Sequence, residues 1–411
     1  MSQVKSGDKG MKILYVSSDK FPPFRVDVAV LFGEKMVARG NQVDWVLQSE
    51  DQKKTSEVVD WWGGRVWVGA STDKMSRMGK IKKQLQALRN DLRVLGLAKK
   101  NRYDIIQVKD KFAAALIGLV AARIGKAKFI YWLSFPIAEA YLLRFKEGTA
   151  KHPVVNYLRG HISKWLLYKL IMPCADLVVL QSEQMKKDVI SEGVSEGKLT
   201  AVPMGVKIED MPYSGGVDAT RPFPMVVYLG TLVRVRRMDF LIRAFAVTKM
   251  RVPDAVLYLV GGGEDDTDIE VLKAEVSRLG LDDAVIFTGF MPMKDAWDFV
   301  RKADVCVSPF YPTPILNSTS PTKLVEYMAM GKPVVANDHP EQSLVIRESG
   351  AGICVPYDEE RFGEAIANLL EDRAAAIRMG VDGRKYVEKN RSYEVIADRL
   401  QEKYLRVAGK T

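Results

Sequence analysis

The segment 317–338, NSTSPTKLVEYMAMGKPVVAND, combines a helix start with side chains suited to holding a phosphate. Ser320 can cap a helix, Pro321 fits the first helical position, and Gly331 ends the helical pattern. The open amides and the dipole at such a helix N-terminus favour a bound anion. The spacing therefore predicts a short helix that presents its N-terminus to a phosphate group.

The first turns of this helix add side chains to the backbone amides. Thr322, Lys323 and Leu324 lie in the first turn, where an ammonium group adds positive charge to the anion site. Glu326 lies about one turn further along, and its carboxylate can accept hydrogen bonds from two neighbouring sugar hydroxyls. The alternative is a well-capped surface helix with a solvated glutamate.

A second group of charged side chains follows a strand-like run that ends at Gly230. The next loop begins with Thr231 and places Arg234, Arg236 and Arg237 within four positions. Guanidinium groups bind phosphate oxygens through paired hydrogen bonds, so this loop suits a diphosphate. The alternative is a solvated basic loop.

Short apolar runs that alternate with helical patterns provide the scaffold for these groups. Most of the runs are apolar on both faces, as strands covered by helices on both sides must be. The predicted strands are 12–18, 42–48, 65–70, 103–109, 128–134, 176–182, 199–205, 224–230, 255–261, 284–290, 304–310, 332–338 and 352–358. Ligands of such sheets bind at the carboxyl ends of the strands, which is where both charged groups lie.

A Pro- and Gly-rich stretch without periodicity, 203–224, separates two βα series and reads as an interdomain linker. We therefore expect an α/β fold of two doubly wound parallel-sheet, Rossmann-like domains that face each other across a cleft. The N-terminal domain spans 11–205 and the C-terminal domain 223–391. The last helix, about 392–408, is expected to pack back on the N-terminal domain.

The composition excludes several classes of protein. The chain has 411 residues, of which 47% are hydrophobic and 27% charged, as in ordinary globular proteins. Three cysteines and three histidines argue against a disulfide framework and against a metal site. No run reaches ~18 uncharged apolar residues, and the polar start lacks the apolar core of a signal peptide. We expect a cytoplasmic protein.

The positive charge is concentrated in the first half of the chain. Residues 1–210 hold 35 Lys and Arg against 22 Asp and Glu, whereas residues 211–411 hold 26 against 29. The first half is therefore expected to meet something anionic: nucleic acid, a membrane surface or a phosphorylated substrate. Nucleic acid is disfavoured, because the basic residues are not interleaved with exposed-looking aromatic side chains and no helix-turn-helix or RNA-recognition motif occurs.

Two basic amphipathic helices are predicted in this half, one at 73–102 and one at 158–173. The first carries an apolar stripe of Met75, Met78, Ile81, Leu85, Leu88, Leu92 and Leu95. Contact with an anionic bilayer would explain the pattern, so that the protein would lie on the inner face of the membrane. The alternative is that both helices pack on the sheet through their apolar stripes and leave only a basic face in solvent.

Taken together, the second half resembles the family 4 retaining glycosyltransferases of the GT-B architecture. The matching segments are VVYLGTLVRVRRMDFLIRAF, LYLVGGGED, VIFTGF, ADVCVSP, SPTKLVEYMAMGKPVVA and SGAGICVPYD. The resemblance implies transfer of a sugar from a nucleoside-diphosphate sugar, without a metal or other cofactor. The implied acceptor, held by the N-terminal domain, is a glycan or a lipid-linked precursor.

The resemblance also implies roles for single residues. Glu326 would hold the ribose, Arg236 takes the place of a lysine that grips the diphosphate, and Phe290 and Met291 would meet the base. Ser318 stands where many members have a further glutamate near the donor sugar, and it is expected at the catalytic centre with Arg236, Lys323 and Glu326. The donor would also meet Gly230, Thr231, Arg234, Ser320, Thr322 and Leu324.

A different class of function stays open. Ser318 replaces the expected glutamate, Thr231 an arginine, and Ser134 lies at or near the usual catalytic-site histidine. The loop FPPFRVD, with Arg25 and Asp27, replaces a glycine pair. A non-catalytic partner protein that binds sugar nucleotides is therefore the alternative to an enzyme.

Overall fold

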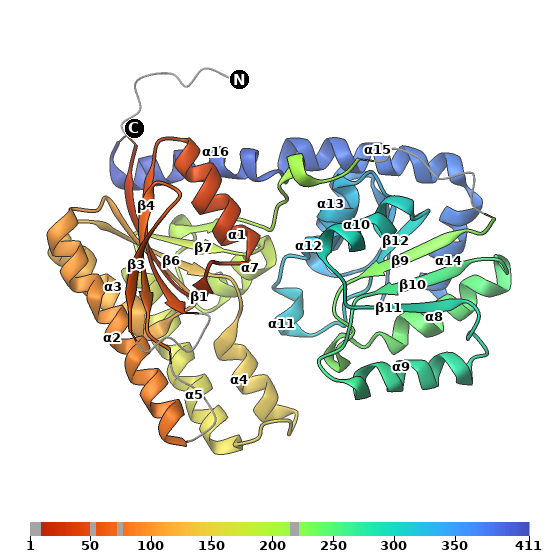
Figure 1. Cartoon of the computed structure of the whole chain (residues 1–411), viewed down its shortest axis with the longest axis horizontal. Coiled ribbons are helices and arrows are strands. Elements are labelled where there is room, and N and C mark those ends of the chain that lie inside the picture. The colour runs from red at the N-terminus through yellow and green to blue at the C-terminus, as the bar shows by residue number, and fades with distance from the viewer. Residues whose placement is uncertain (1–9, 50–54, 72–76, 214–221, 411) are drawn as a thin grey trace. The chain divides into compact units, whose positions relative to one another are not determined.

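The computed structural model describes residues 10–49, 55–71, 77–213 and 222–410 (Figure 1). The chain divides into two compact units. The first comprises Met1–Pro203 and Tyr393–Thr411, and the second comprises Met204–Ser392. The division lies at the start of the predicted linker, because Val206 and Met211 pack into the core of the second unit.

The first unit is built on an eight-stranded sheet with the order β3-β4-β2-β1-β5-β6-β7-β8. Its strands are β1 (Lys12–Phe21), β2 (Gln42–Ser49), β3 (Glu57–Trp61), β4 (Gly64–Gly69), β5 (Ile105–Lys109), β6 (Lys128–Leu133), β7 (Leu177–Leu180) and β8 (Leu199–Ala201). The sheet is parallel as expected, with one exception at its edge, where β3 runs antiparallel to β4. The charged Glu57 and Asp60 interrupt the apolar pattern of β3, so the sequence analysis missed this strand.

Helices cover both faces of this sheet. They are α1 (Val26–Val28) with its π-helical continuation η1 (Ala29–Met36), α2 (Arg77–Asn101), α3 (Phe112–Gly125), α4 (Ile137–Lys146), α5 (Pro153–Trp165) with η2 (Leu166–Ile171) and α6 (Met172–Cys174), α7 (Glu183–Ser191), the short η3 (Glu196–Lys198) and α16 (Tyr393–Ala408). Alternate side chains of β1 enter two cores, Ile13 and Tyr15 on one face and Leu14 and Val16 on the other. Tyr404 of α16 is fully buried in the Tyr15 core.

Helix α2 does not pack on the sheet through the apolar stripe seen in its sequence. Val94 and Ala98 are buried, together with Asn90 and Asp91, and Asp91 forms an ion pair with Lys111. The apolar side chains of Ile81, Leu85, Leu88 and Leu92 are instead 40–60% exposed. The alternative in which the whole apolar stripe packs on the sheet is therefore wrong for this helix. Met75 lies outside the described residues.

The second unit holds a six-stranded parallel sheet with the order β11-β10-β9-β12-β13-β14. Its strands are β9 (Met225–Leu229), β10 (Val256–Val260), β11 (Val285–Gly289), β12 (Val305–Ser308), β13 (Val334–Asn337) and β14 (Gly352–Val355). Its helices are η4 (Ile208–Asp210), η5 (Arg234–Arg236), α8 (Asp239–Arg251), α9 (Asp266–Arg278), α10 (Met293–Lys302), α11 (Pro314–Asn317), α12 (Thr322–Ala329), α13 (Pro340–Ser349), α14 (Glu359–Glu371) and α15 (Arg373–Asn390).

Two glycines let the loops after β9 and β10 approach each other. A Cβ atom on Gly261 would lie 2.1 Å from the carbonyl oxygen of Gly230, a distance that the backbone cannot accommodate. The Leu232 amide also donates to the Gly262 carbonyl at 2.8 Å. The loop that carries the three arginines is therefore fixed by backbone contacts, and it starts at the carboxyl end of β9.

Candidate active site

The strand order of the second sheet reverses between β9 and β12, because β9 pairs with β10 on one side and with β12 on the other. Open α/β sheets bind ligands outside the carboxyl ends of their strands at such a switch point. Gly230 follows β9 and Phe310 lies just beyond β12, so their loops border this position. The side chains that the sequence predicts to bind phosphate lie beside this switch point.

Lys323 is the central charge of the site. Its ammonium donates a hydrogen bond to the Tyr228 hydroxyl at 2.8 Å and lies 4.0 Å from the centroid of the same ring. Burial, reinforced by the nearby charge of Arg236, lowers the pKa of Lys323 well below its usual value. A Cβ on Gly230 would lie 3.0 Å from the ammonium nitrogen, so a glycine there leaves room for this side chain.

Arg236 joins Lys323 at this position. The guanidinium of Arg236 lies 5.8 Å from the centroid of the Phe310 ring, and the Lys323 ammonium lies 5.7 Å from the same centroid. Two cations beside one aromatic ring repel each other, and this repulsion adds to the effect of burial in lowering the pKa of Lys323. A bound dianion would relieve this repulsion.

Helix α12 begins at Thr322 rather than at Pro321. The predicted cap at Ser320 is wrong, because the Ser320 hydroxyl accepts a hydrogen bond from the Met204 amide at 3.0 Å and no side chain caps the helix. The Tyr327 hydroxyl accepts from the Leu229 amide at 2.8 Å and thereby ties α12 to β9. The helix therefore points its uncapped first turn, with Thr322 and Lys323, toward the end of β9.

Glu326 lies one turn into α12 and is partly buried. Burial raises its pKa to about 6, although the positive charge of Lys323 opposes this rise. The carboxyl group therefore titrates on the acid side of neutral pH, and a ligand that donates hydroxyl hydrogen bonds would favour the charged form. The structure thus keeps Glu326 and Lys323 within electrostatic reach of each other, as the helical spacing predicts.

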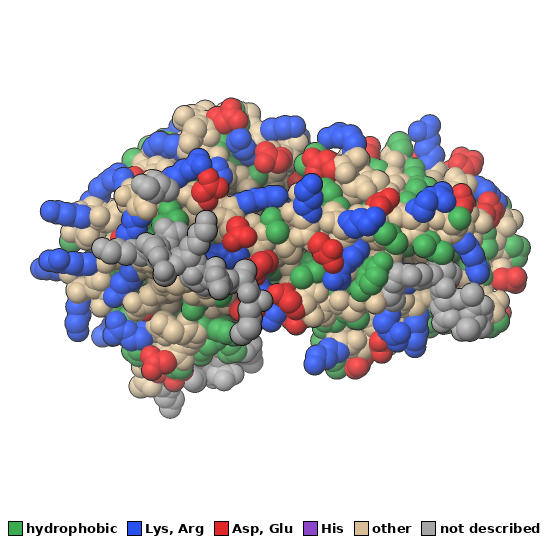
Figure 2. Space-filling view, turned by 90° about the horizontal axis from the view of Figure 1, so that it is seen from above, with side chains coloured by type: hydrophobic (Ala, Val, Ile, Leu, Met, Phe, Trp, Pro, Cys, Tyr) green, Lys and Arg blue, Asp and Glu red, His purple; other side chains and the backbone are tan. Residues whose placement is uncertain are grey.

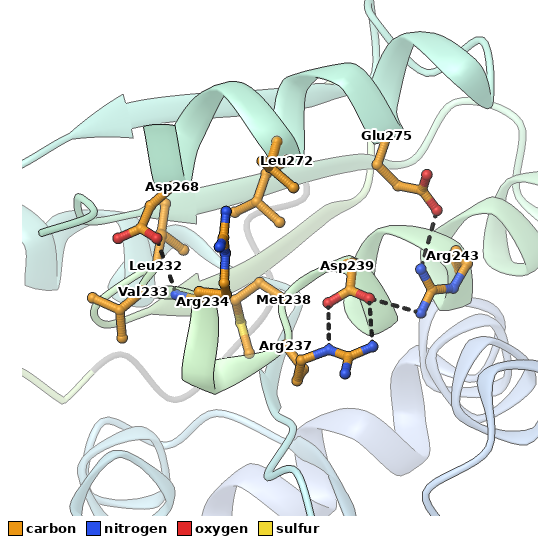
Figure 3. Close-up of a pocket in the computed structure, with 11 residues that line it drawn as sticks. Leu232, Val233, Arg234, Arg237, Met238, Asp239, Arg243, Asp268, Leu272 and Glu275 are labelled. Atoms are coloured by element: carbon orange, nitrogen blue, oxygen red, sulfur yellow. Dashed lines mark hydrogen bonds and ion pairs between the residues drawn. The ribbon is translucent and has the colours of Figure 1, made fainter. Parts of the chain in front are cut away.

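The three arginines of the loop are not directed to one place. Arg234 is exposed and lines a separate pocket with Asp268 and Leu272 of α9, and its own amide donates to Asp268 (Figure 3). Arg237, in a left-handed conformation, forms two hydrogen bonds with Asp239 (Figure 3). Arg236 is therefore the arginine that the structure brings together with Lys323.

The remaining predicted residues differ in exposure. Phe290 follows β11 and is 91% exposed, whereas Met291 packs against the core of the second unit. Leu324 is buried in the same core and anchors the helix. Thr231 is exposed, and its carbonyl accepts from the Tyr228 hydroxyl at 3.2 Å. Ser318 is buried at the end of α11.

Tyr228 and Phe310 also contribute to the site, although neither is predicted from the sequence. Tyr228 looks like an ordinary buried strand residue, since it is fully buried and 95 positions away from Lys323. Burial raises its pKa to about 12, so its hydroxyl stays protonated and can accept from Lys323 while donating to Thr231. The only signal available in the sequence is its place two residues before the strand-ending Gly230.

The first unit has its own polar cluster at the switch point of its sheet, between β1 and β5. The Lys109 ammonium lies 2.9 Å from Asp27, which also accepts two hydrogen bonds from Arg25. Although burial opposes it, these two positive charges hold the pKa of Asp27 below its usual value. Arg25 and Asp27, which stand in place of the family's glycine pair, thus form a fixed ion-pair network with Lys109.

Beside this network, Asp110 and Ser134 form a pair. The Ser134 amide donates to Asp110 at 2.8 Å, and the Ser134 hydroxyl donates to the other carboxylate oxygen. Burial raises the pKa of Asp110.

Among the described residues, no group of three or more His, Cys, Asp or Glu side chains is arranged to hold a metal ion. Within the same residues, no helix combines the length and apolarity needed to cross a bilayer.

Comparisons with known proteins identify both units. The model of "Glycosyltransferase Family 4" matches residues 27–210, and that of "Glycosyl transferases group 1" matches residues 223–372. A GDP-mannose-dependent alpha-(1-6)-phosphatidylinositol monomannoside mannosyltransferase from Mycolicibacterium smegmatis is 32% identical over 44% of this chain and 47% of its own length. Mannosylfructose-phosphate synthase from Agrobacterium fabrum is 30% identical over 50% of this chain and 48% of its own length. The match thus spans about half the length of these relatives.

Solved structures share the fold over nearly the whole chain. Sucrose-phosphate synthase from Thermosynechococcus elongatus has a TM-score of 0.73 and 20% identity, and covers 98% of this chain and 100% of its own. Anabaena Alr3699/HepE in complex with UDP-glucose has a TM-score of 0.65 and 18% identity, and covers 96% of this chain and 99% of its own. With its two sheets, its switch-point lysine and the two matched models, the chain belongs to glycosyltransferase family 4, with the two-domain GT-B fold.

Proposed function

We propose that the protein is a retaining glycosyltransferase that moves a sugar from a nucleoside-diphosphate sugar to an acceptor. The observation that carries this proposal is the pairing of Lys323 and Arg236 beside the uncapped start of α12. The two side chains and the helix amides supply positive charge at one point, which suits the diphosphate of the donor. Glu326, one turn away, would accept hydrogen bonds from the ribose hydroxyls.

In the proposed reaction the same groups stabilise the leaving diphosphate. Negative charge develops on the diphosphate as the glycosidic bond breaks, and preorganised cations lower the free energy of that state. The acceptor hydroxyl would attack from the face that the diphosphate leaves, and its proton would pass to a phosphate oxygen. Lys323 and Arg236 provide the compensating charge in this scheme, so we propose that no metal ion or other cofactor is required, and excess chelator should leave the rate unchanged.

We place the acceptor site in the first unit, at the carboxyl ends of β1 and β5. The Asp110–Ser134 pair could orient an acceptor hydroxyl there, since each carboxylate oxygen retains a lone pair beyond its bond to Ser134. The names of the relatives support sugar acceptors of two kinds, a phosphatidylinositol mannoside and a fructose phosphate.

For this protein we favour an acceptor of the first kind, a lipid-linked or polysaccharide precursor at an anionic membrane surface. On the face seen in Figure 2, basic and acidic side chains are interspersed and hydrophobic ones are scattered. Helix α5 differs from that pattern, because Val154, Leu158, Ile162 and Trp165 recur along it and are 53–69% exposed. Its apolar stripe and that of α2, each accompanied by lysines and arginines, suit the interface of an anionic bilayer.

A panel of nucleoside diphosphates and sugar nucleotides tests the enzymatic proposal. One of them at about 100 times its dissociation constant should stabilise the folded protein by ~2.7 kcal/mol in a thermal-shift measurement. The same sugar nucleotide should be hydrolysed slowly without acceptor, and the released sugar should keep its anomeric configuration. Tight binding without any turnover, with or without a lipid extract, would favour the non-catalytic alternative. No stabilisation by any nucleotide would contradict both.

A further inference from the structure

One pocket in the first unit is lined by residues to which the reaction scheme above gives no role. It encloses about 290 Å³ between the carboxyl end of β4 and one face of α2. Gln86, Arg89, Asn90 and Arg93 of α2 line it, and their spacing of three and four residues places them on one side of the helix. This side lies between the buried face of α2 and its exposed apolar stripe.

The charge of this pocket is positive. Arg89 is exposed, and the Arg93 guanidinium donates a hydrogen bond to the Ser56 hydroxyl. No aspartate or glutamate is found among the described residues that line the pocket. Two guanidinium groups one helical turn apart can bind the oxygens of one phosphate through charge-assisted hydrogen bonds.

Asn90 supplies an independent sign of a missing partner. It is 3% exposed, and its Nδ2 atom donates to the Leu47 carbonyl at 2.9 Å. This bond fixes the orientation of the amide, because the Leu47 carbonyl can only accept. The Oδ1 atom is then left buried without a hydrogen-bond donor among the described residues. A buried acceptor of this kind costs folding free energy unless a donor reaches it.

The backbone is shaped to hold Asn90 in this place. A Cβ atom on Gly69, at the end of β4, would lie 2.7 Å from Nδ2 of Asn90. Only a glycine therefore lets the amide lie so close to the strand end. The pocket is thus lined by two arginines and by an asparagine whose buried side-chain oxygen has no hydrogen-bond donor among the described residues.

We propose that this pocket binds a phosphomonoester of a sugar or polyol, with the phosphate on Arg89 and Arg93 and a hydroxyl donating to Asn90. Binding itself does not depend on the proposed reaction. That the bound molecule is the acceptor, or the part of it that is recognised, rests on the proposed function. The phosphomonoester can belong to a free sugar phosphate or to a lipid headgroup.

Calorimetry on the full chain without nucleotide tests the site with defined probes. Glucose 6-phosphate and myo-inositol 1-phosphate should bind, and glucose and myo-inositol should not. Inorganic phosphate should bind roughly tenfold more weakly than the better sugar phosphate, because it lacks the hydroxyl that Asn90 would accept. Vesicles with phosphatidylinositol 4-phosphate should retain the protein instead if the phosphomonoester belongs to a lipid.

Two double variants with the same change of charge give a matched comparison. Arg89→Gln with Arg93→Gln should weaken binding of the preferred probe roughly 100-fold, since each arginine contributes charged hydrogen bonds. Lys99→Gln with Lys100→Gln, exposed on the same helix, should change it less than threefold. If the double variant does not fold, the single variant Arg89→Gln replaces it in the comparison, because it changes only an exposed side chain.

The outcomes separate this proposal from the enzymatic one. Loss of probe binding in the pocket variants with unchanged nucleotide binding supports the site. If neither soluble probes nor vesicles bind, or if the pocket and control variants weaken binding equally, the pocket assignment is overturned. A sugar phosphate that binds here while no nucleotide binds anywhere would leave the pocket standing and remove its role as an acceptor site.

Discussion

The Lys323 ammonium lies 2.8 Å from the Tyr228 hydroxyl and 4.0 Å from the centre of the Tyr228 ring. The ammonium group of Lys323 thus contacts both the hydroxyl group and the ring face of Tyr228. The tyrosine comes from the strand β9 and the lysine from the first turn of α12, so this contact sets the ammonium at the switch point of the sheet.

Tyr228→Phe tests whether the hydroxyl positions Lys323. The variant keeps the ring but removes a hydrogen bond to a charged group, which is worth about 1.5–3 kcal/mol. We expect kcat/KM to fall at least tenfold, mainly through kcat, while the melting temperature changes little. Tyr258→Phe, on the neighbouring strand β10, is the matched control and should behave like the wild type. Equal rates in the two variants would show that the hydroxyl has no positioning role.

The three arginines of the loop after β9 point to different places, so the effects of their variants on the transfer rate can be compared. Arg236→Ala should lower the transfer rate roughly 10²–10³-fold, the usual cost of one preorganised group at a developing charge. Arg234→Ala and Arg237→Ala should cost less than tenfold, because Arg234 lines a separate pocket and Arg237 is paired with Asp239. Steady-state kinetics of the three variants provide the measurement. A uniform effect would mean that only the total charge of the loop matters.

Glu326 should make donor affinity fall in acid. Its pKa is about 6 in the folded protein, so the carboxylate that would accept the ribose hydroxyls is lost as pH falls below that value. The affinity should also fall in alkali, below the usual lysine range, as Lys323 loses its proton. Calorimetric titration of the nucleoside diphosphate between pH 5 and 9 should therefore give a bell-shaped profile. Glu326→Gln should remove the acid limb.

The raised pKa of Glu326 also makes the stability of the folded protein depend on pH. Here the protonated form is favoured, whereas donor binding favours the charged form. The folded pKa of Glu326, about 6, exceeds the value of 4.5 for the unfolded chain, so folding favours the protonated form. This stabilisation is complete below pH 4.5 and is lost as pH rises through about 6. Glu326→Gln should therefore be more stable than the wild type at pH 8, by on the order of 1–2 kcal/mol, and no more stable at pH 4. Chemical denaturation at both pH values tests the sign.

The exposed apolar stripes predict binding to anionic vesicles. Basic residues near such a surface contribute about 1 kcal/mol each, and the attraction weakens as salt shortens the Debye length from ~10 Å at 0.1 M to ~3 Å at 1 M. Ile162→Ser with Trp165→Ser, or Leu85→Ser with Leu88→Ser, should reduce sedimentation with these vesicles severalfold. Val271→Ser with Ile377→Ser, also exposed but in the second unit, should not. A wild type that ignores anionic vesicles at low salt would refute the membrane proposal.

Local patterns predicted most of the strands and the helix that carries Lys323 and Glu326, because these depend on neighbours along the chain. Apolar runs give buried parallel strands, and a spacing of three residues brings Lys323 and Glu326 to one side of a helix. The contact between Lys323 and Tyr228 could not be predicted in this way, since it depends on how α12 packs against β9. Similarly, the left-handed backbone at Arg237 and its pairing with Asp239 could not be predicted from local patterns.

Helix α2 shows the limit of periodicity most clearly. An apolar stripe of leucines normally marks the buried side of a helix, but here Asn90 and Asp91 are buried and Leu85 and Leu88 are exposed. The buried polar groups are tolerated because Asn90 bonds to Leu47 and Asp91 pairs with Lys111. Such partners lie far away in the sequence, so hydrophobicity alone points to the wrong face.

The return of α16 to the first unit constrains the order in which the protein can mature during its synthesis. Ile396, Leu400 and Tyr404 complete one of the two cores of the first sheet, yet a ribosome adds them only after the whole second unit. The second unit, Met204–Ser392, is continuous and can fold as soon as its own residues have emerged. The first unit is therefore completed only after the second has been synthesised, and until then Tyr15 and Phe32 lack part of their cover.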